Sequence, residues 1–243
     1  MAPILKIEQL SFHYGDNPAP VFANLDLSVE KGEFVAVVGG SGVGKSTLLK
    51  CVADLAHSSS GRITLDIPER HASRRRATVF QDGRLLPWRR LRGNIAYGLK
   101  GLNLSKTDQQ ARIDEVLALT RLTELADRWP HQLSGGQAQR AGIARALAVH
   151  PDLLLMDEPF SAVDAITRQH LQDELLNIWQ KTGAAVLFIT HDIEEAVYLA
   201  DRVVVLSGSP ARVQLDQPVE LARPRGRNAE DLQQLAHAIA QEL

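Results

Sequence analysis

The chain has 243 residues, a formal net charge of −2 at pH 7 and 44% hydrophobic residues, which suits one large α/β domain with a buried core. A charge so close to zero argues against a nucleic-acid-binding protein, which normally carries a basic excess or a basic face. Cys51 is the only cysteine, so neither an intrachain disulfide nor a cysteine-based zinc site is possible. No secretion signal is visible, and no apolar run approaches the roughly 20 residues that span a bilayer. We therefore expect a cytosolic protein, or one held at a membrane by a partner.

The first segments predict antiparallel β-structure. Residues 4–10 alternate in polarity, and a second alternating run extends from Phe22 to Val29, as half-buried strands do. Between these runs, Tyr14 precedes Gly15. Its ring is either a packing residue on a strand face or an aromatic surface on which adenine stacks, and the residues alone leave both interpretations open.

A strand, a glycine-rich loop and a helix follow one another over residues 33–56. The loop has the pattern G-x-x-x-x-G-K-S, in which the glycines allow a tight turn and close approach of a ligand. The loop N–H groups and the start of the helix then form a nest for phosphate oxygens. Lys45 is expected to reach the β- and γ-phosphates, and the Ser46 hydroxyl to ligate Mg²⁺. The predicted nucleoside triphosphate site comprises Gly39, Gly40, Ser41, Gly42, Val43, Gly44, Lys45, Ser46 and Thr47.

Two further short strands are predicted at residues 62–67 and 77–80. Gln81 directly follows the second of them, and α/β sheets bind ligands at the carboxyl ends of their strands. The next apolar segment, Leu85–Trp88, cannot continue a strand or a helix through its proline. It is either a loop packed into the core or an exposed docking surface for a partner.

Residues 92–149 have a helical texture without strand candidates. A capping box begins at Ser105 and opens a helix with apolar residues at a 3.6-residue period. Residues 133–137 read Leu-Ser-Gly-Gly-Gln and precede an alanine-rich helix that we expect to reach His150. Two glycines at a helix start expose backbone N–H groups to an anion, although many ordinary turns share this feature.

The next buried strand, residues 153–156, leads into Asp157 and Glu158 before Pro159 stops it. An acidic pair at such a strand end is the expected shape of a Mg²⁺-organising carboxylate in a phosphate-loop enzyme. The alternative is that both acids are solvent-facing turn residues. A helix then begins around residues 161–164.

Residues 185–189 predict another buried strand, and polar residues follow at its end. Among them, His191 would ordinarily be a helix cap or a packing residue. Residues 203–206 and 211–215 predict a closing hairpin, and residues 229–243 have a helical texture.

Together and in this order, the motifs resemble one family, the nucleotide-binding subunits of ATP-binding cassette transporters. Residues 39–46 resemble its Walker A motif, 133–137 its signature, and 153–157 with Glu158 its Walker B motif and catalytic acid. The remaining correspondences are Gln81 with the Q-loop, residues 161–164 with the D-loop and His191 with the switch histidine. The resemblance spans residues 4 to 222. One small departure is Ala138, where the family often has a basic or large polar residue.

The resemblance implies an α/β fold, a P-loop NTPase cassette with a RecA-like core, an antiparallel β subdomain and an inserted α-helical subdomain. The chain would be one ATPase domain over residues 1–243. Its core, with the antiparallel β subdomain, would comprise residues 1–84 and 150–222, and its helical signature subdomain residues 85–149. Residues 223–243 would form a short helical tail.

The resemblance also implies that ATP and Mg²⁺ bind, with Tyr14 as the surface for adenine. The Lys45 side chain would hold the phosphates, Glu158 would orient or deprotonate the attacking water, and His191 would contact the γ-phosphate. The implied catalytic set is Lys45, Gln81, Glu158 and His191, and the metal set is Ser46, Gln81 and Asp157.

A second copy of the chain is the first implied partner. In the family, the signature faces the phosphate loop of another subunit, so that two ATP molecules lie across a two-fold interface. The residues that would complete the nucleotide site from this side are Ser134, Gly135, Gly136, Gln137 and Asp164.

Leu85–Trp88 after the Q-loop resembles a narrower group, the nitrate, sulfonate and taurine importers, and is closest in appearance to the subunits for aliphatic sulfonates. This implies a peripheral protein at the cytoplasmic face of the cell membrane, with permease subunits and, indirectly, a periplasmic or surface solute-binding protein. Other interpretations are an importer ATPase for a pyrimidine or thiamin precursor and a soluble cassette ATPase acting on DNA or the ribosome. A phosphate-loop kinase or GTPase would leave the signature and His191 unexplained.

Overall fold

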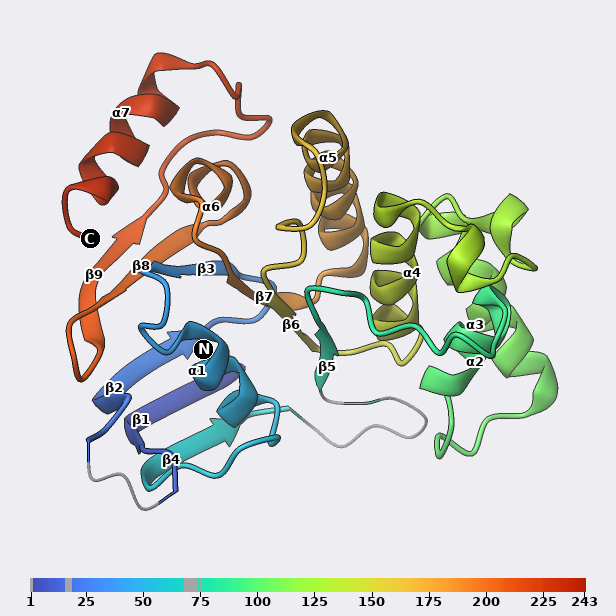
Figure 1. Ribbon diagram of the computed structural model, residues 1–243, viewed down its shortest axis with the longest axis horizontal. Coiled ribbons are helices and arrows are strands. Elements are labelled where there is room, and N and C mark those ends of the chain that lie inside the picture. Colours follow the sequence, from blue (N-terminus) through green and yellow to red (C-terminus); the bar gives the residue numbers. More distant parts are fainter. Residues whose placement is uncertain (1, 16–18, 68–73, 75) are drawn as a thin grey trace. The chain divides into compact units, whose positions relative to one another are not determined.

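The computed structural model describes residues 2–15, 19–67, 74 and 76–243 (Figure 1). The described chain folds into two compact units. The first unit combines the N-terminal part up to Ile67 with the C-terminal part Ala185–Leu243, and the second is the intervening segment Pro68–Ala184. Among the described residues, no helix combines the length and the apolarity that a membrane span requires.

An antiparallel sheet forms the N-terminal part of the first unit. Its middle strand β1 (Leu5–Phe12) pairs with β2 (Phe22–Val29) on one side and with β4 (Ser60–Leu65) on the other. The polar alternation predicted β1 and β2, because such strands bury one face and expose the other. β4 begins two residues before the predicted strand. Gly61 there has a φ of +86°, and a Cβ at this position would overlap the carbonyl group of Gln9.

The second sheet of the first unit is mainly parallel. Strand β3 (Phe34–Gly39) is buried along its whole length and lies between β7 (Ala185–Ile189) and β8 (Arg202–Ser207), both parallel to it. At the edge, β9 (Arg212–Pro218) pairs antiparallel with β8 and alternates in exposure. Unbroken apolar runs predicted β3 and β7, because a strand covered on both faces has no polar side.

Three helices are described in the first unit. α1 (Lys45–Val52) follows the glycine-rich loop and ends earlier than predicted, because Asp54 adopts a left-handed conformation with a φ of +62°. α6 (Ile193–Leu199) and α7 (Glu230–Ala240) pack against each other (Figure 1). α6 was not predicted as a helix, because seven residues are too few to show a 3.6-residue period.

The second unit joins a short parallel strand pair to a group of helices. Strand β5 (Arg76–Val79) pairs with β6 (Leu153–Asp157). α2, α3 and α5 each pack against α4. α4 ends before the predicted boundary, because His150 has a left-handed φ of +47° ahead of a proline. The helical elements are α2 (Leu91–Gly98), α3 (Lys106–Leu119), α4 (Gly135–Leu147), α5 (Ala165–Thr182) and the short 3₁₀ helices Thr123–Leu125 and Pro130–Gln132.

Candidate nucleotide-binding site

The glycine-rich loop at the end of β3 surrounds the ammonium group of Lys45. This side chain is 5% exposed, and its Nζ donates to the carbonyl oxygens of Gly39 at 2.7 Å and Gly40 at 3.0 Å. A lysine charge is costly to bury without such partners. The loop therefore holds one fixed positive charge beside its own backbone.

Two glycines of the loop have conformations or neighbours that exclude a side chain. A Cβ on Gly39 would lie 2.5 Å from the carbonyl oxygen of Leu206 on β8. Gly44 has a φ of +110°, and its Cβ would lie 2.7 Å from Val21 Cγ1. Within the described chain, no side chain caps α1 at Gly44 and no acidic residue occupies its first turn. The positive end of this helix is thus not neutralised by a carboxylate of the first turn.

Tyr14 lies against the first turn of α1. Its hydroxyl group is 2.7 Å from Thr47 Oγ1, and either oxygen can be the donor. The ring packs edge-on against Phe12 with centroids 4.8 Å apart, yet 56% of the residue remains exposed. The ring thus packs against a residue of the strand, as the first of the two interpretations expects, and its exposed part leaves the second interpretation open.

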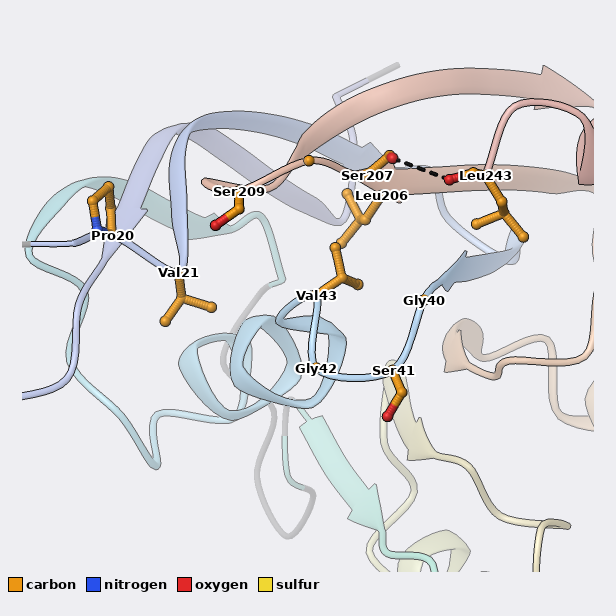
Figure 2. A pocket seen from close by; sticks show the side chains of 11 residues that line it. Pro20, Val21, Gly40, Ser41, Gly42, Val43, Leu206, Ser207, Ser209 and Leu243 are labelled. Atoms are coloured by element: carbon orange, nitrogen blue, oxygen red, sulfur yellow. Dashed lines mark hydrogen bonds between the residues drawn. The ribbon is translucent and has the colours of Figure 1, made fainter.

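A pocket of about 400 Å³ lies beside the phosphate loop in the first unit (Figure 2). It is bounded by the loop backbone on one side and by the turn after β8 on the other, and the Ser207 hydroxyl donates to the Leu243 carbonyl at 3.4 Å. The residues that line it are Pro20, Val21, Gly40–Val43, Leu206–Ser209 and Leu243, so that neither Lys45 nor Ser46 borders it.

His191 follows β7 and is exposed. The helix cap at this point is its neighbour Asp192, whose carboxylate accepts from the N–H group of Glu195 at 3.0 Å. Capping, one of the two ordinary roles considered for a histidine here, therefore belongs to Asp192 and not to His191.

In the second unit, Gln81 follows β5 at a turn that is attached to α4. Arg145 donates to the carbonyl oxygens of Gly83 and Arg84, both at 2.7 Å, and burial lowers the pKa of this guanidinium. Sequence reasoning did not identify Arg145, because its partners lie about 60 residues away. These hydrogen bonds attach Gly83 and Arg84, which follow Gln81, to α4, the helix that begins at the signature.

The signature residues form the first turn of α4. The Ser134 hydroxyl accepts from the N–H group of Gln137 at 3.3 Å, and the Gln137 side-chain oxygen accepts from the N–H group of Ser134 at 2.9 Å. Ser134 and Gly135 are exposed, whereas Gly136 is buried, and its Cβ would lie 2.8 Å from Thr167 on α5. This capping box was not predicted, although its S-x-x-Q pattern is readable in the sequence.

Asp164 is the N-cap of α5. Its carboxylate accepts from the N–H group of Thr167 at 3.0 Å, and the hydrogen bonds from Thr167 lower its pKa below the usual range. The side chain is therefore held as an anion at the start of a helix, where a negative charge is favoured.

Asp157 is the last residue of β6 and Glu158 follows it, and both are half-buried. Glu158 has a left-handed φ of +43°, which is uncommon for a residue with a side chain. Its carbonyl oxygen accepts from the Ser161 hydroxyl at 2.9 Å, so the following turn holds this conformation. Their intermediate burial does not fit a freely solvated turn.

The segment Leu85–Trp88 is hydrogen-bonded to a buried residue of α2, whereas its tryptophan side chain is exposed. Trp88 is 70% exposed, which excludes the interpretation that its ring packs into the core. Asn94 on α2 is fully buried; its side-chain oxygen accepts from Leu86 N–H at 2.7 Å and its amide donates to Arg89 O at 2.8 Å. Sequence reasoning missed Asn94, because a lone asparagine in a helix carries no motif.

The predicted site residues thus fall into two sets. Tyr14, the phosphate loop from Gly39 to Thr47, and His191 belong to the first unit. The second unit holds Gln81, Ser134, Gly135, Gly136, Gln137, Asp157, Glu158 and Asp164.

The phosphate loop between a buried parallel strand and an uncapped helix places the chain among the P-loop nucleotide-binding proteins. Residues 22–161 match the family model described as ABC transporter. The taurine import ATP-binding protein TauB of Pseudomonas putida is 46% identical over 211 residues, which cover 86% of this chain and 80% of TauB. The nitrate import ATP-binding protein NrtD of Synechococcus elongatus is 46% identical over 217 residues, with 87% and 79% covered.

Two solved structures are similar in fold. One is CbiO1 from Clostridium perfringens, described as part of the ABC transporter complex CbiONQ, with a TM-score of 0.80 and 29% identity over 90% of both chains. The other is the ATP-binding cassette MJ0796, a dimer in a post-hydrolysis state bound to ADP and Pi. Its TM-score is 0.74 at 28% identity, over 90% of this chain and all of the other.

The chain belongs to the ABC transporter family. It is an ATP-binding, ATP-hydrolysing subunit of an importer, and the predicted cassette fold and ATPase activity are confirmed.

Proposed function

We propose that this ATPase works as a homodimer that energises uptake of a small anionic or zwitterionic solute, of the sulfonate, taurine or nitrate type, through a separate permease. The observation that carries the proposal is the phosphate loop with its enclosed Lys45 at an uncapped helix start. The solute class is supported by the 46% identity to a taurine and a nitrate import subunit. Leu85–Trp88 supports the same subfamily.

ATP would bind along the first unit. Its adenine would stack on the exposed ring of Tyr14, which the Thr47 contact holds beside α1. Its phosphates would accept hydrogen bonds from the N–H groups of residues 40–47, and Lys45 would exchange its carbonyl partners for phosphate oxygens. Loop and helix would supply most of the positive field, because phosphoryl transfer asks the protein mainly for positioning and electrostatic stabilisation.

The donor set fits Mg²⁺. Within the described residues, no three or more His, Cys, Asp or Glu side chains form a group that would hold a metal by themselves. Mg²⁺ ordinarily keeps several waters and takes one or two protein oxygens together with substrate phosphates. We assign these positions to the Ser46 hydroxyl and the Asp157 carboxylate, with Gln81 as a further ligand. When bound, the ion would neutralise part of the phosphate charge.

Water attack would depend on two residues at strand ends. Glu158, fixed in a left-handed conformation after β6, would orient or deprotonate the water. His191 would contact the γ-phosphate. A displacement of Gln81 on nucleotide binding would be transmitted to the helices of the second unit, because Arg145 attaches the turn after Gln81 to α4.

A second copy would complete each site. Ser134, Gly135, Gly136 and Gln137 would contact the γ-phosphate bound by the partner subunit, and Asp164 would lie at the same interface. The exposed Ser134 and Gly135 at the start of α4 support this assignment, as does the dimeric, ADP-bound state of the related MJ0796 cassette.

We propose one ATPase domain over residues 1–243, with core residues 1–84 and 150–222, helical residues 85–149 and a tail of residues 223–243.

The permease would dock on Leu85–Trp88. A tryptophan that is 70% exposed on a loop braced by buried Asn94 is a preformed apolar contact, as protein interfaces often use. The protein would then lie at the cytoplasmic face of the cell membrane, and a periplasmic or surface binding protein would deliver the solute. Copurification with a polytopic membrane protein checks this partner.

Shared catalysis is tested by mixing two inactive variants. Lys45→Ala lacks the phosphate-loop charge and Ser134→Ala lacks the signature hydroxyl, so each alone should be inactive. Mixed dimers would contain one intact site, and an equimolar mixture should recover up to roughly a quarter of the wild-type rate in a symmetric dimer. ATP hydrolysis is measured as phosphate release against the mixing ratio.

Ser105→Ala is the matched control for Ser134→Ala. Ser105 also caps a helix, with its hydroxyl accepting from Asp108 N–H at 3.1 Å, but it lies outside the predicted site. This variant should keep its activity when alone. If the Lys45 and Ser134 variants fold and pair but no hydrolysis returns on mixing, the shared site is wrong.

A further inference from the structure

His191 leaves β7 between two residues whose backbones are fixed by hydrogen bonds. Thr190 is 2% exposed, and its N–H group donates to Val37 O at 3.2 Å. Its hydroxyl group donates to Glu195 Oε2 at 2.6 Å and accepts from Asp192 N–H at 3.0 Å. The residues on both sides of His191 are therefore tied by the same hydroxyl group.

Glu195 closes this arrangement from the first turn of α6. It is 6% exposed, and its N–H group donates to the Asp192 carboxylate at 3.0 Å. Three hydrogen bonds thus join Thr190, Asp192 and Glu195 into a ring. A short O–H···O bond to a carboxylate is among the stronger hydrogen bonds in proteins. An acidic group is also favoured at a helix start.

The ring of hydrogen bonds is attached to β3, the strand that leads into the phosphate loop. Ile189 pairs with Val37 of β3, two positions before Gly39. The N–H group of Thr190 continues this pairing by donating to Val37 O. A shift of the Thr190 backbone relative to β3 would therefore move His191 relative to the phosphate loop of the same unit.

We propose that Thr190 and Glu195 are positioning residues for His191. Their hydrogen bond fixes the peptide groups on both sides of the histidine, and thereby the placement of its imidazole toward the γ-phosphate. The inference rests on the proposed role of His191. Helix capping alone does not require this pair, because Asp192 already caps α6 with its own carboxylate. A buried acid and hydroxyl are costly to place in an interior, and an apolar pair would fill the same volume.

The first test compares substitutions that keep or remove the hydroxyl group. Thr190→Val has the same shape but cannot donate to Glu195, whereas Thr190→Ser can. We expect Thr190→Val to lower kcat on the order of ten- to a hundredfold, the effect of a small misplacement, with KM for ATP nearly unchanged. Thr190→Ser should restore most of the rate. Equal rates for the two variants would overturn the proposal.

A second variant pair removes the same charge at adjacent positions of α6. Glu195→Gln replaces the buried carboxylate by a neutral amide, whose oxygen accepts a weaker hydrogen bond from Thr190, whereas Glu194→Gln replaces an exposed neighbour in the same turn. Only Glu195→Gln should lower kcat. Because both variants lose one negative charge near the helix start, equal loss would indicate a helix-dipole effect instead and would contradict positioning.

A double-mutant cycle separates positioning from a general structural role. If Thr190 acts through His191, Thr190→Val should have no further effect on single-turnover hydrolysis in a His191→Ala background. An undiminished effect in that background would refute the inference while leaving the role of His191 intact. A His191→Ala enzyme with the wild-type rate would instead refute the proposed role of His191.

The imidazole signals of the full-length chain provide a readout independent of activity. The His191 signal is identified by its loss in His191→Ala. It should shift in Thr190→Val and Glu195→Gln, with the signals of the other histidines unchanged. If the His191 signal keeps its position in both variants, positioning is refuted.

Discussion

The thiol of Cys51 lies in the buried side of α1, within the helix that follows the phosphate loop. The residue is 5% exposed, and burial raises the pKa of its thiol from 9.0 to about 11. The thiolate is the reactive form, and at pH 8 it would be about a thousandth of the population. We therefore expect native Cys51 to resist iodoacetamide at pH 8 and to react rapidly once guanidinium unfolds the chain.

The same pKa shift predicts the direction of a stability change. Because the folded-state pKa is raised, the contribution of the neutral thiol is fully present below about pH 9 and is lost as the pH rises toward 11. Cys51→Ala should remove this part of the alkaline dependence of unfolding. Mass spectrometry of alkylation against pH checks the first expectation, and fast labelling of folded protein at pH 8 would contradict it.

Residue-level prediction succeeded where a function requires consecutive residues. The phosphate loop is one uninterrupted pattern, so the strand before it and the helix after it could be read directly. It failed for Asn94, Arg145 and Glu195, whose importance comes from contacts made in the fold. Each is an ordinary polar residue on a helix until its partner is known.

Arg202 joins several strands of the first unit at one point. Its guanidinium donates to Glu33 Oε1 at 2.8 Å before β3, to Asp216 Oδ2 at 2.8 Å on β9, and to the carbonyl oxygen of Ser28 on β2. Burial alone lowers the pKa of Arg202, but Glu33 and Asp216 outweigh it and raise the pKa. The side chains of Arg202 and Glu33 are 17% and 16% exposed.

Arg202→Met should lower the free energy of unfolding by about 3–5 kcal/mol, because it leaves a largely buried carboxylate without its main partner. Arg202→Lys should cost less, since one point contact survives without the fork geometry. The control is Lys6→Met, which breaks an exposed pair with Glu8 and should cost under about 1 kcal/mol. Urea unfolding curves measure all three variants, and equal losses for Arg202→Met and Lys6→Met would contradict the reasoning.

Elements were predictable where their period is long enough to be recognised. Alternation gave β1 and β2, and unbroken apolar runs gave β3, β6 and β7. Boundaries were less accurate, because a single left-handed residue ends α1 and α4 earlier than apolar periodicity suggests. The seven residues of α6 are defined by the Asp192 cap and by packing against α7, and neither is a repeating pattern.

At the scale of the whole molecule, the proposed chemistry needs more than one chain provides. The phosphate loop and the signature lie in separate units of the protein, and we propose that each serves a different nucleotide in a pair of subunits. The order of motifs along the sequence predicts the family, yet it cannot give the distance between residues of two subunits. The oligomeric state with and without ATP is therefore the measurement that tests whether two subunits share each nucleotide.

Glu158→Gln should trap a closed dimer in the presence of ATP. The amide has nearly the shape of the carboxylate, so the strained turn after β6 should persist, but it cannot deprotonate or properly orient the attacking water. ATP would then remain bound at both shared sites. Sedimentation velocity should show a monomer or weak dimer without nucleotide and a stable dimer in saturating Mg²⁺–ATP.

Lys45→Ala combined with Glu158→Gln should stay monomeric, because the phosphates lose their main cation. A Glu158→Gln protein that stays monomeric in saturating ATP would rule out nucleotide shared between two copies.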